Sequence, residues 1–258
     1  MNKSIAIIGA GNVATSLALS FADAGVPPVA VWSRSLAAAR ILGSSVGCPS
    51  FTDIESMPDA DIVIISVVDD ALPEVARAVA ARYSHSLVLH TAGSISMALL
   101  HAAGCNNYGV FYPMQTFSKG RRVDFSTVNV FVEGCNEQAC NIAESLACKL
   151  GAKVHRATSE QRRYLHLAAV FACNFSNAAY AMAAELLERN GLPFDAMLPL
   201  IDETAAKVHK LSPREAQTGP ASRGDTAVMQ RQRELLDGEL RAAYDLFSEY
   251  IQNRNDKL

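Results

Sequence analysis

The residues best suited to chemistry stand on an apolar stretch of the chain that predicts one long helix. His166, Asn174 and Asn177 are polar positions on it. In an unbroken α-helix, Asn177 lies ~20° and Asn174 within ~80° of the face of His166. Unpaired burial of a polar group costs about 2–7 kcal/mol, so we expect the three to share a polar cavity. His166 is then a candidate proton donor with Asn174 beside it, and a satisfied core or interface histidine is the alternative interpretation.

Another histidine and a glycine-bounded turn supply further candidates. His90 ends an apolar strand, where it is either a catalytic group or the partner of a neighbouring loop. Arg223 lies between Gly219 and Gly224, and an arginine in such a shaped turn can bind a carboxylate or phosphate. Asp225 is also a natural helix N-cap, and Arg223 could merely pair with it. We expect the substrate to contact five residues, namely Gln115, Asn177, Gly219, Arg223 and Asp225.

A glycine turn near the start of the chain predicts dinucleotide binding. Residues 5–8 form an apolar run typical of a strand buried on both faces, and residues 12–24 return as a helix with an apolar face. Gly25 suits the C-cap of that helix, and residues 29–32 predict a second strand. Between strand and helix, Gly9 permits the tight turn, while Gly11 lets the backbone approach a pyrophosphate at the helix N-terminus.

The end of the second strand favours NADP over NAD. The run Trp32-Ser33-Arg34-Ser35 has no carboxylate to hold a ribose 2′-hydroxyl, whereas Arg34 and the serines can bind a 2′-phosphate. The alternative is a solvated arginine that starts the next helix. We expect NADP to contact residues that follow the carboxyl ends of the strands, namely Gly9, Gly11, Asn12, Val13, Ser33, Arg34, Ser66, Val67, Thr91 and Gly93.

An α/β domain must position these residues. Strands are expected at residues 5–8, 29–32, 48–51, 61–67, 86–91, 108–112, 127–132 and 152–155. Helices are expected at residues 12–24, 35–43, 71–82 with Asp70 as N-cap, 94–103 and 137–150. This alternation predicts a doubly wound parallel Rossmann sheet, in which ligands bind at the carboxyl ends of the strands.

Beyond the sheet the chain predicts an all-helical domain. A helix starting at residue 159 continues to residue 189 without glycine or proline, and helices at residues 193–211 and 225–253 follow. Residues 165–184 are apolar almost all round, and such a helix must be buried on several sides. We therefore expect residues 1–157 to form an NADP-binding Rossmann domain and residues 158–258 a helical domain for substrate binding and homodimer formation.

Composition excludes several classes of protein. A net charge of −3 gives no reason to expect nucleic acid or an anionic membrane as a partner, and no segment is expected to be a signal peptide or to cross a membrane. The 6 cysteines form no C-x-x-C pair, which favours reduced thiols in a cytoplasmic protein over disulfides or a metal site.

These motifs together resemble a known superfamily. A Rossmann domain followed by a domain on one long helix resembles the 6-phosphogluconate dehydrogenase-like superfamily. Its glycine turn and Trp32-Ser-Arg-Ser35 look like those of pyrroline-5-carboxylate reductases and of F420-dependent NADP oxidoreductase-like proteins. Three further stretches look closer to the DUF2520 group of NADP oxidoreductase-like proteins. They are His90-Thr-Ala-Gly-Ser94, Tyr112-Pro-Met-Gln-Thr-Phe117, and residues 218–225 together with residues 166–175.

The resemblance implies hydride transfer between NADP and a small, carboxylated substrate bound between the two domains. Hydroxyacid dehydrogenases of the superfamily carry a catalytic lysine four residues before an asparagine of the long helix. Here Val170 stands at that place before Asn174, and valine cannot move a proton. The sequence therefore leaves two functions open, an NADP-dependent oxidoreductase and a catalytically silent NADP-binding sensor or scaffold. It also leaves open whether a deazaflavin or a carbon centre exchanges the hydride.

Overall fold

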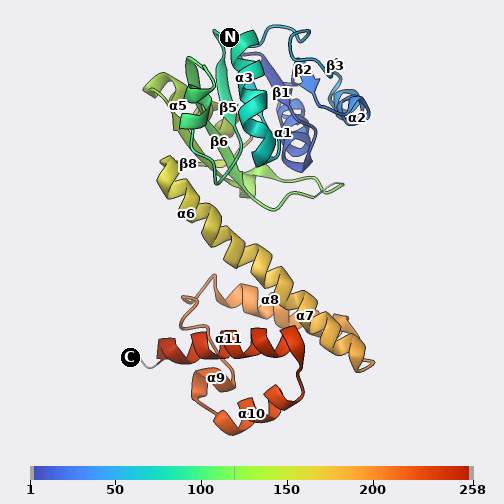
Figure 1. The fold of residues 1–258 in the computed structure, drawn as a ribbon, viewed down its shortest axis with the longest axis vertical. Coiled ribbons are helices and arrows are strands. Elements are labelled where there is room, and N and C mark those ends of the chain that lie inside the picture. The colour runs from blue at the N-terminus through green and yellow to red at the C-terminus, as the bar shows by residue number, and fades with distance from the viewer. Residues whose placement is uncertain (1–2, 119, 256–258) are drawn as a thin grey trace. The chain divides into compact units, whose positions relative to one another are not determined.

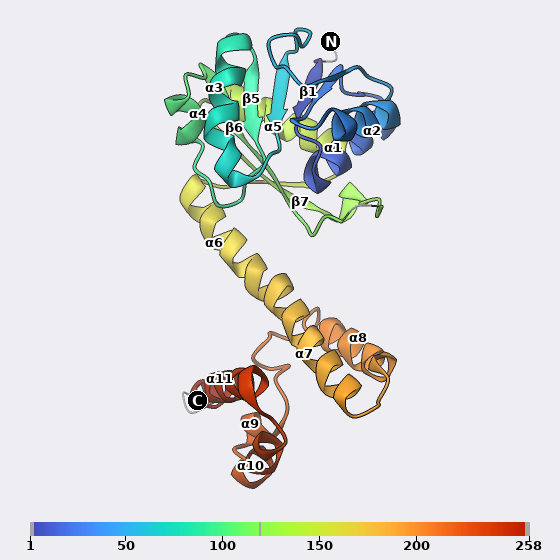
Figure 2. The same ribbon diagram turned by 45° about the vertical axis from the view of Figure 1, so that its right-hand side comes forward.

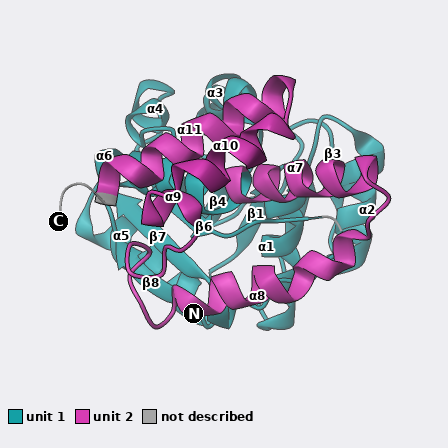
Figure 3. Ribbon diagram, turned by 90° about the horizontal axis from the view of Figure 1, so that it is seen from below, with its two compact units in different colours: residues 1–174 teal, residues 175–258 magenta. Residues whose placement is uncertain are grey.

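The computed structural model describes residues 3–118 and 120–255 (Figure 1). The chain forms two compact units, residues 1–174 and residues 175–258 (Figure 3). The division lies inside the long helix, and each unit is described by itself. The last strand of the sheet stops at Arg156, and the division of the chain at residue 157 into two domains stays a prediction.

The first unit contains a single mixed sheet. Its strands are β1 (Ile5–Ile8), β2 (Ala30–Trp32), β3 (Ser50–Phe51), β4 (Ile62–Ile65), β5 (Leu87–His90), β6 (Asn107–Met114), β7 (Asn129–Gly134) and β8 (Lys153–Arg156). They are ordered β3-β2-β1-β4-β5-β6-β7-β8. All neighbouring pairs are parallel except β6 with β7. The α/β prediction is confirmed, with one antiparallel pairing that the sequence analysis did not foresee.

The antiparallel pairing follows from the connection between β6 and β7. Parallel neighbours need a crossover, usually a helix, whereas antiparallel strands can be joined directly. Among the described residues of this connection, the short helix η2 (Phe125–Thr127) is the only helix. Strand β6 also runs on through Pro113, which pairs with Val130, whereas the strand was expected to end at residue 112.

Helices cover both faces of the sheet (Figure 2). One face packs against α1 (Asn12–Asp23), α2 (Leu36–Val46) and α5 (Glu137–Lys149), and its core includes Phe21 and Phe111. The other face packs against α3 (Leu72–Arg82) and α4 (Ala98–Ala102). The predicted cap of α3 is wrong, because Asp70 belongs to the preceding short helix η1 (Asp69–Ala71) and Ala71 takes the N-cap position without a side-chain bond. The expected αL glycine after α1 is present, since Gly25 has a φ of 74°.

The two outer strands of the sheet differ in character. Strand β3 has two residues, while β8 exposes Lys153, His155 and Arg156. The Arg156 guanidinium reaches back to helix α5, where it bonds Glu137 at 2.7 Å and Glu144 at 2.6 Å.

The long helix is continuous but changes its winding. Helix α6 (Ser159–Ala169) starts with a capping box between Thr158 and Gln161, and α7 (Ser176–Arg189) ends the run. Between them lies a π-helical segment, Val170–Phe175. One such turn inserts roughly one residue and shifts the following face by ~100°. The face shared by His166 and Asn177 was counted on an unbroken α-helix, and that count is therefore wrong.

The second unit is helical, as predicted. It contains η4 (Phe194–Met197), α8 (Leu198–Lys207), α9 (Pro220–Arg223), α10 (Thr226–Glu234) and α11 (Gly238–Asn255). The single last helix expected at residues 225–253 is in fact two, separated before Gly238, which has a φ of 47°.

Large apolar side chains of the long helix are exposed in the single chain, although their composition predicted burial. Phe171 is 62% exposed and Tyr164 is 69% exposed. The helix Ser159–Arg189 is long and apolar enough to cross a membrane, a test that core helices of soluble proteins also pass.

Candidate functional site

A cavity of about 530 Å³ lies at the carboxyl ends of the strands, where the chain order reverses between β1 and β4. Such a switch point is the usual ligand site of an open α/β sheet. All of the predicted cofactor residues line it, namely Gly9, Gly11, Asn12, Val13, Ser33, Arg34, Ser66, Val67, Thr91 and Gly93. A second cavity of about 480 Å³ lies at the amino ends of β1 and β4 and contains none of these residues.

The glycine turn has the geometry of a phosphate-binding loop. Gly9 has a φ of 129°, and a Cβ there would lie 2.0 Å from the backbone oxygen of Ser66. No other residue type fits, because both the backbone conformation and the neighbouring strand oppose a side chain. Gly11 is the N-cap of α1, which has no side-chain cap and no acidic residue in its first turn. The helix N-terminus therefore offers free backbone N–H groups and a positive dipole end to an anion.

The end of β2 supplies a second group of polar contacts. The N–H of Ser35 donates to Ser33 Oγ at 3.3 Å, and Ser35 Oγ caps α2 by accepting from Ala38 N. Arg34 is exposed and lines the cavity, and within the described residues it forms no ion pair. The guanidinium is thus available to a charged ligand at this end of the cavity.

Hydrogen bonds between neighbouring strand ends and loops form the wall in the middle of the cavity. Thr91 Oγ1 donates to Ser66 Oγ at 3.1 Å, and Ser94 Oγ donates to Asp69 at 2.7 Å. Asn12 donates from Nδ2 to the backbone oxygen of Phe117 at 2.9 Å. The last contact fastens the loop after β6 to the start of α1.

His166 and Tyr112 lie together in the wall of the cavity. Tyr112 Oη is 3.1 Å from His166 Nδ1, and the two rings meet edge to face with centroids 6.0 Å apart. A Cβ on Gly93 would lie 2.7 Å from that nitrogen, so the turn after β5 can approach the pair only as glycine. Burial raises the pKa of Tyr112 above its usual value. Gln115 lines the same cavity.

Two predicted catalytic residues do not line the cavity. His90 has no exposed surface, and its Nδ1 accepts from the N–H of Ala92 at 3.2 Å. Burial, and then the charge of Arg162, lower the pKa of His90 to about 3, so its ring is neutral. Asn174 lies in the π-helical segment, outside the lining.

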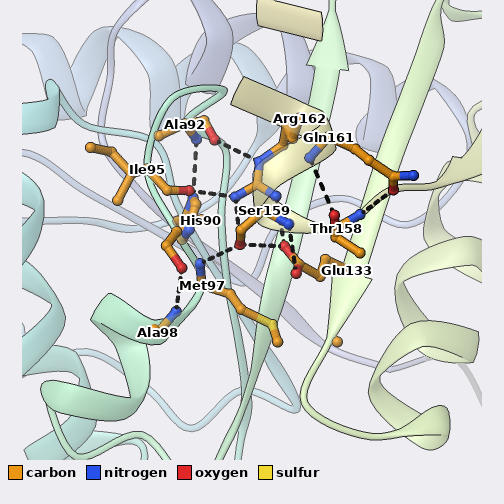
Figure 4. Close-up of polar contacts among 12 residues, drawn as sticks. His90, Ala92, Ile95, Met97, Ala98, Glu133, Thr158, Ser159, Gln161 and Arg162 are labelled. Atoms are coloured by element: carbon orange, nitrogen blue, oxygen red, sulfur yellow. Dashed lines mark hydrogen bonds and ion pairs between the residues drawn. The ribbon is translucent and has the colours of Figure 1, made fainter. Parts of the chain in front are cut away.

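Arg162 holds the turn after β5 in place (Figure 4). Its side chain is fully buried and donates to the backbone oxygens of Ala92 and Ile95. Its Nη1 pairs with Glu133 at 2.7 Å, and Glu133 also accepts from the N–H and hydroxyl of Ser159. One buried ion pair therefore connects three segments, namely the β5–α4 turn, strand β7 and the start of α6.

The remaining predicted residues belong to the second unit. Asp225 caps α10 by accepting from Val228 N at 3.1 Å, which confirms the capping interpretation. Arg223 ends the short helix α9, between Gly219 with a φ of 110° and Gly224 with a φ of 68°. Substrate contact by these residues and by Asn177 stays a prediction.

The sequence does not single out Tyr112 among the candidate residues, although the motif Tyr112–Phe117 begins with it. Its contact with His166 joins residues far apart in the sequence, so only the folded chain brings the two together.

The sheet order and the glycine turn define a dinucleotide-binding Rossmann domain joined to a helical domain. A family profile described as "NADP oxidoreductase coenzyme F420-dependent" matches residues 4–93, and one described as "Domain of unknown function (DUF2520)" matches residues 128–251. A crystal structure of "putative NADP oxidoreductase BF3122" from Bacteroides fragilis is 44% identical, with 98% of each chain covered and a TM-score of 0.92. The chain belongs to the DUF2520 family of NADP oxidoreductase-like proteins, which confirms the resemblance drawn from its motifs.

More distant structures share the fold. An imine reductase from Myxococcus stipitatus in complex with NADP⁺ is 17% identical, with 98% of this chain and 94% of that chain covered and a TM-score of 0.73. A pyrroline-5-carboxylate reductase from Coxiella burnetii is 18% identical, with 100% of this chain and 98% of that chain covered and a TM-score of 0.63. A comparison with curated proteins finds no match.

Proposed function

We propose that the protein is an NADP-dependent oxidoreductase that transfers a hydride to or from a small, carboxylated substrate. The observation that carries the proposal is one cavity that joins the glycine turn, Arg34 and the Tyr112–His166 pair. A ligand with phosphates at one end and a reactive ring at the other suits such a cavity. The NADP oxidoreductase profile over residues 4–93 supports the same cofactor.

The cofactor's parts have matching partners along the cavity. The lack of room for any side chain at Gly9 and the uncapped start of α1 suit a pyrophosphate. Arg34 and Ser33 suit a 2′-phosphate, and Thr91 and Gly93 suit the nicotinamide end. When bound, NADP(H) supplies or accepts the hydride, so the protein has to orient the substrate and handle a proton.

His166 is the proposed proton donor in the direction of reduction. Its ring lines the cavity, and because Tyr112 occupies Nδ1, the nitrogen left for a substrate is Nε2. Arg223 is the proposed anchor for the substrate carboxylate, because a guanidinium can bind both carboxylate oxygens.

The competing function is a catalytically silent NADP-binding sensor or scaffold. Val170 favours it, because a lysine at that position is the proton carrier that the resemblance would require. His90 also favours it, since a buried neutral ring outside the cavity cannot serve the substrate.

Cofactor choice can be measured without knowing the substrate. The chain has one tryptophan, Trp32, which lines the cavity, so its fluorescence should report cofactor binding. Wild-type protein should bind NADPH more tightly than NADH. Arg34→Ala should remove most of that preference, because a charged hydrogen bond is worth about 1.5–3 kcal/mol, or roughly 10- to 150-fold. Arg40→Ala, on the helix that follows, is the matched control, and equal wild-type affinities for the two cofactors would contradict the proposal.

To test for catalysis, hydroxy, keto, imino and amino acids are screened with NADPH and NADP, and the reaction is followed by the absorbance of the nicotinamide. On a substrate that the screen returns, His166→Ala should lower kcat by ~10²–10⁴-fold with unchanged NADPH affinity. Arg223→Ala should raise KM for an acidic substrate. Tight NADPH binding with no turnover of any compound would favour the silent protein.

Exposed apolar surface supports self-association as part of the proposal. Phe171, Leu200 and Leu246 are 62%, 61% and 66% exposed in the single chain. A second copy of the chain would cover such a surface and give the long helix the burial that its composition demands. Sedimentation should show a dimer without detergent. A monomer, or protein that floats with phospholipid vesicles, would refute self-association.

A further inference from the structure

Tyr112 and His166 form a pair whose geometry restricts the imidazole. Tyr112 belongs to β6 and is 9% exposed, while His166 belongs to α6. The hydroxyl oxygen lies 3.1 Å from Nδ1, and the edge-to-face ring contact limits rotation about the bond to the ring. The phenol and the imidazole therefore fix each other.

The turn after β5 encloses the same side of the imidazole. A Cβ on Gly93 would lie 2.7 Å from His166 Nδ1 and 2.8 Å from the Cζ of Tyr112. Nδ1 is thus shielded by the phenol and the turn. Within the described residues, Nε2 is the ring nitrogen without an assigned partner, and the ring lines the cavity.

A hydroxyl suits this position because its oxygen accepts a hydrogen bond without carrying a charge. It accepts from Nδ1–H when the ring is an imidazolium, and it still accepts from Nδ1–H when the ring has lost the proton on Nε2. A carboxylate carries a negative charge and would favour the imidazolium. A phenol therefore supports both protonation states with the ring in the same place.

We propose that Tyr112 is a positioning residue that keeps Nε2 of His166 as the proton-exchanging nitrogen. This inference rests on the proposed function, in which His166 supplies the proton for reduction of a C=O or C=N bond. The substrate carbon gains the hydride, and its oxygen or nitrogen gains the proton from Nε2. The imidazolium becomes neutral by losing the Nε2 proton, and the proton that remains on Nδ1 is still donated to the hydroxyl oxygen of Tyr112. Tyr112 keeps its own proton throughout, as the raised pKa of the phenol allows.

Nitrogen NMR on protein with ¹⁵N-labelled histidine rings tests the placement without cofactor or substrate. The chain has 6 histidines, and the signal of His166 is the one lost in His166→Gln. In wild-type protein the neutral ring should carry its proton on Nδ1, where it is donated to Tyr112 Oη. Tyr112→Phe should raise the ratio of the Nε2–H to the Nδ1–H form about fivefold, as expected for a lost hydrogen bond of ~1 kcal/mol.

Tyr108→Phe is the matched control for this measurement. Tyr108 lies on the same strand and contacts another histidine, His101, with ring centroids 5.7 Å apart. Removal of the Tyr108 hydroxyl should leave the His166 signal unchanged. A wild-type neutral ring protonated at Nε2, or the same tautomer ratio in Tyr112→Phe, would overturn the proposal even if NADPH binds as expected.

Kinetics then separate this inference from the function on which it rests. With a substrate from the screen, Tyr112→Phe should lower kcat about 10-fold and leave the NADPH dissociation constant unchanged. In a His166→Ala background the same change should have no further effect, because Tyr112 acts through His166. If His166→Ala retains wild-type kcat, the proposed function fails. If Tyr112→Phe is equally harmful with and without His166, the positioning role fails.

Discussion

Glu133→Gln should strongly destabilise the first unit, because it leaves the guanidinium of Arg162 buried without a counter-charge. Arg162 has no exposed side-chain surface, and Glu133 is 14% exposed. One carboxylate oxygen accepts from the N–H of Ser159 at 2.8 Å, and the other accepts from the Ser159 hydroxyl and from Arg162, both at 2.7 Å. Glutamine keeps the shape, but in either orientation its NH₂ group faces at least one of these donors.

The size of the effect follows from these contacts. Breaking a buried ion pair by neutralising one partner costs about 3–5 kcal/mol, since the other charge stays buried and unpaired. If the free energy of unfolding falls by ~2 kcal/mol per molar urea, the urea concentration at the unfolding midpoint should fall by roughly 1.5–2.5 M. Adding Arg162→Met should recover part of this loss, because it removes the stranded charge and leaves an apolar side chain in its place.

Trp32 makes the assay specific, since the only tryptophan lies on β2 in the first unit. Its fluorescence in a urea titration therefore reports the unfolding of the sheet domain. The matched control is Asp23→Asn, which breaks a pair with Arg122 whose partners are 67% and 63% exposed. That change should barely move the midpoint, because exposed pairs contribute little. If the Glu133 variant unfolds at the midpoint of the control, or if Arg162→Met fails to recover stability, the argument is refuted.

Three further predictions concern the cavity and its surroundings. Gly9→Ala should abolish NADPH binding or soluble expression. Gly11→Ala should fold normally, because a Cβ at Gly11 meets nothing within 4 Å. Similar expression and similar melting temperatures of the two variants would contradict this prediction. Gly93→Ala should displace the ring of His166 and shift its ¹⁵N signals while the other histidine signals stay in place. Since burial lowers the pKa of His90 from 6.5 to about 3, the unfolded state binds the extra proton and stability should decline by up to ~1.4 kcal/mol per pH unit as pH falls from 6.5 toward 3. Urea midpoints at pH 7 and pH 5 should therefore converge in His90→Gln, and an unchanged difference would show that another group is responsible.

The cofactor end of the cavity could be predicted because its requirements are local. A positive φ at Gly9, an apolar strand before it and a helix after it all occur within one short stretch of chain. Arg34 follows the end of the next strand, so parallel pairing alone brings it to the same edge. Local rules were enough for these residues.

The catalytic end could not be predicted in the same way, because it depends on contacts between distant segments. His90 has the residue type and strand position of a catalytic group, but its ring is fully buried and feels the charge of Arg162, and both depend on how distant segments pack. Tyr112 gains its role from His166, which is 54 positions away in the chain. The π-helical segment Val170–Phe175 has no recognised sequence signal, so a face count across it was bound to fail.

Strand β8 has a consequence for behaviour at high concentration. An open sheet edge presents unpaired backbone groups on which another chain can add a strand, which is how many proteins begin to aggregate. Here the outer edge exposes Lys153, His155 and Arg156, while the opposite edge, β3, has only two residues. Two copies that approached through β8 would have to take Lys153 and the ion-paired Arg156 out of water before their backbones could pair. The sheet can therefore end in solvent without acting as a template for fibrils.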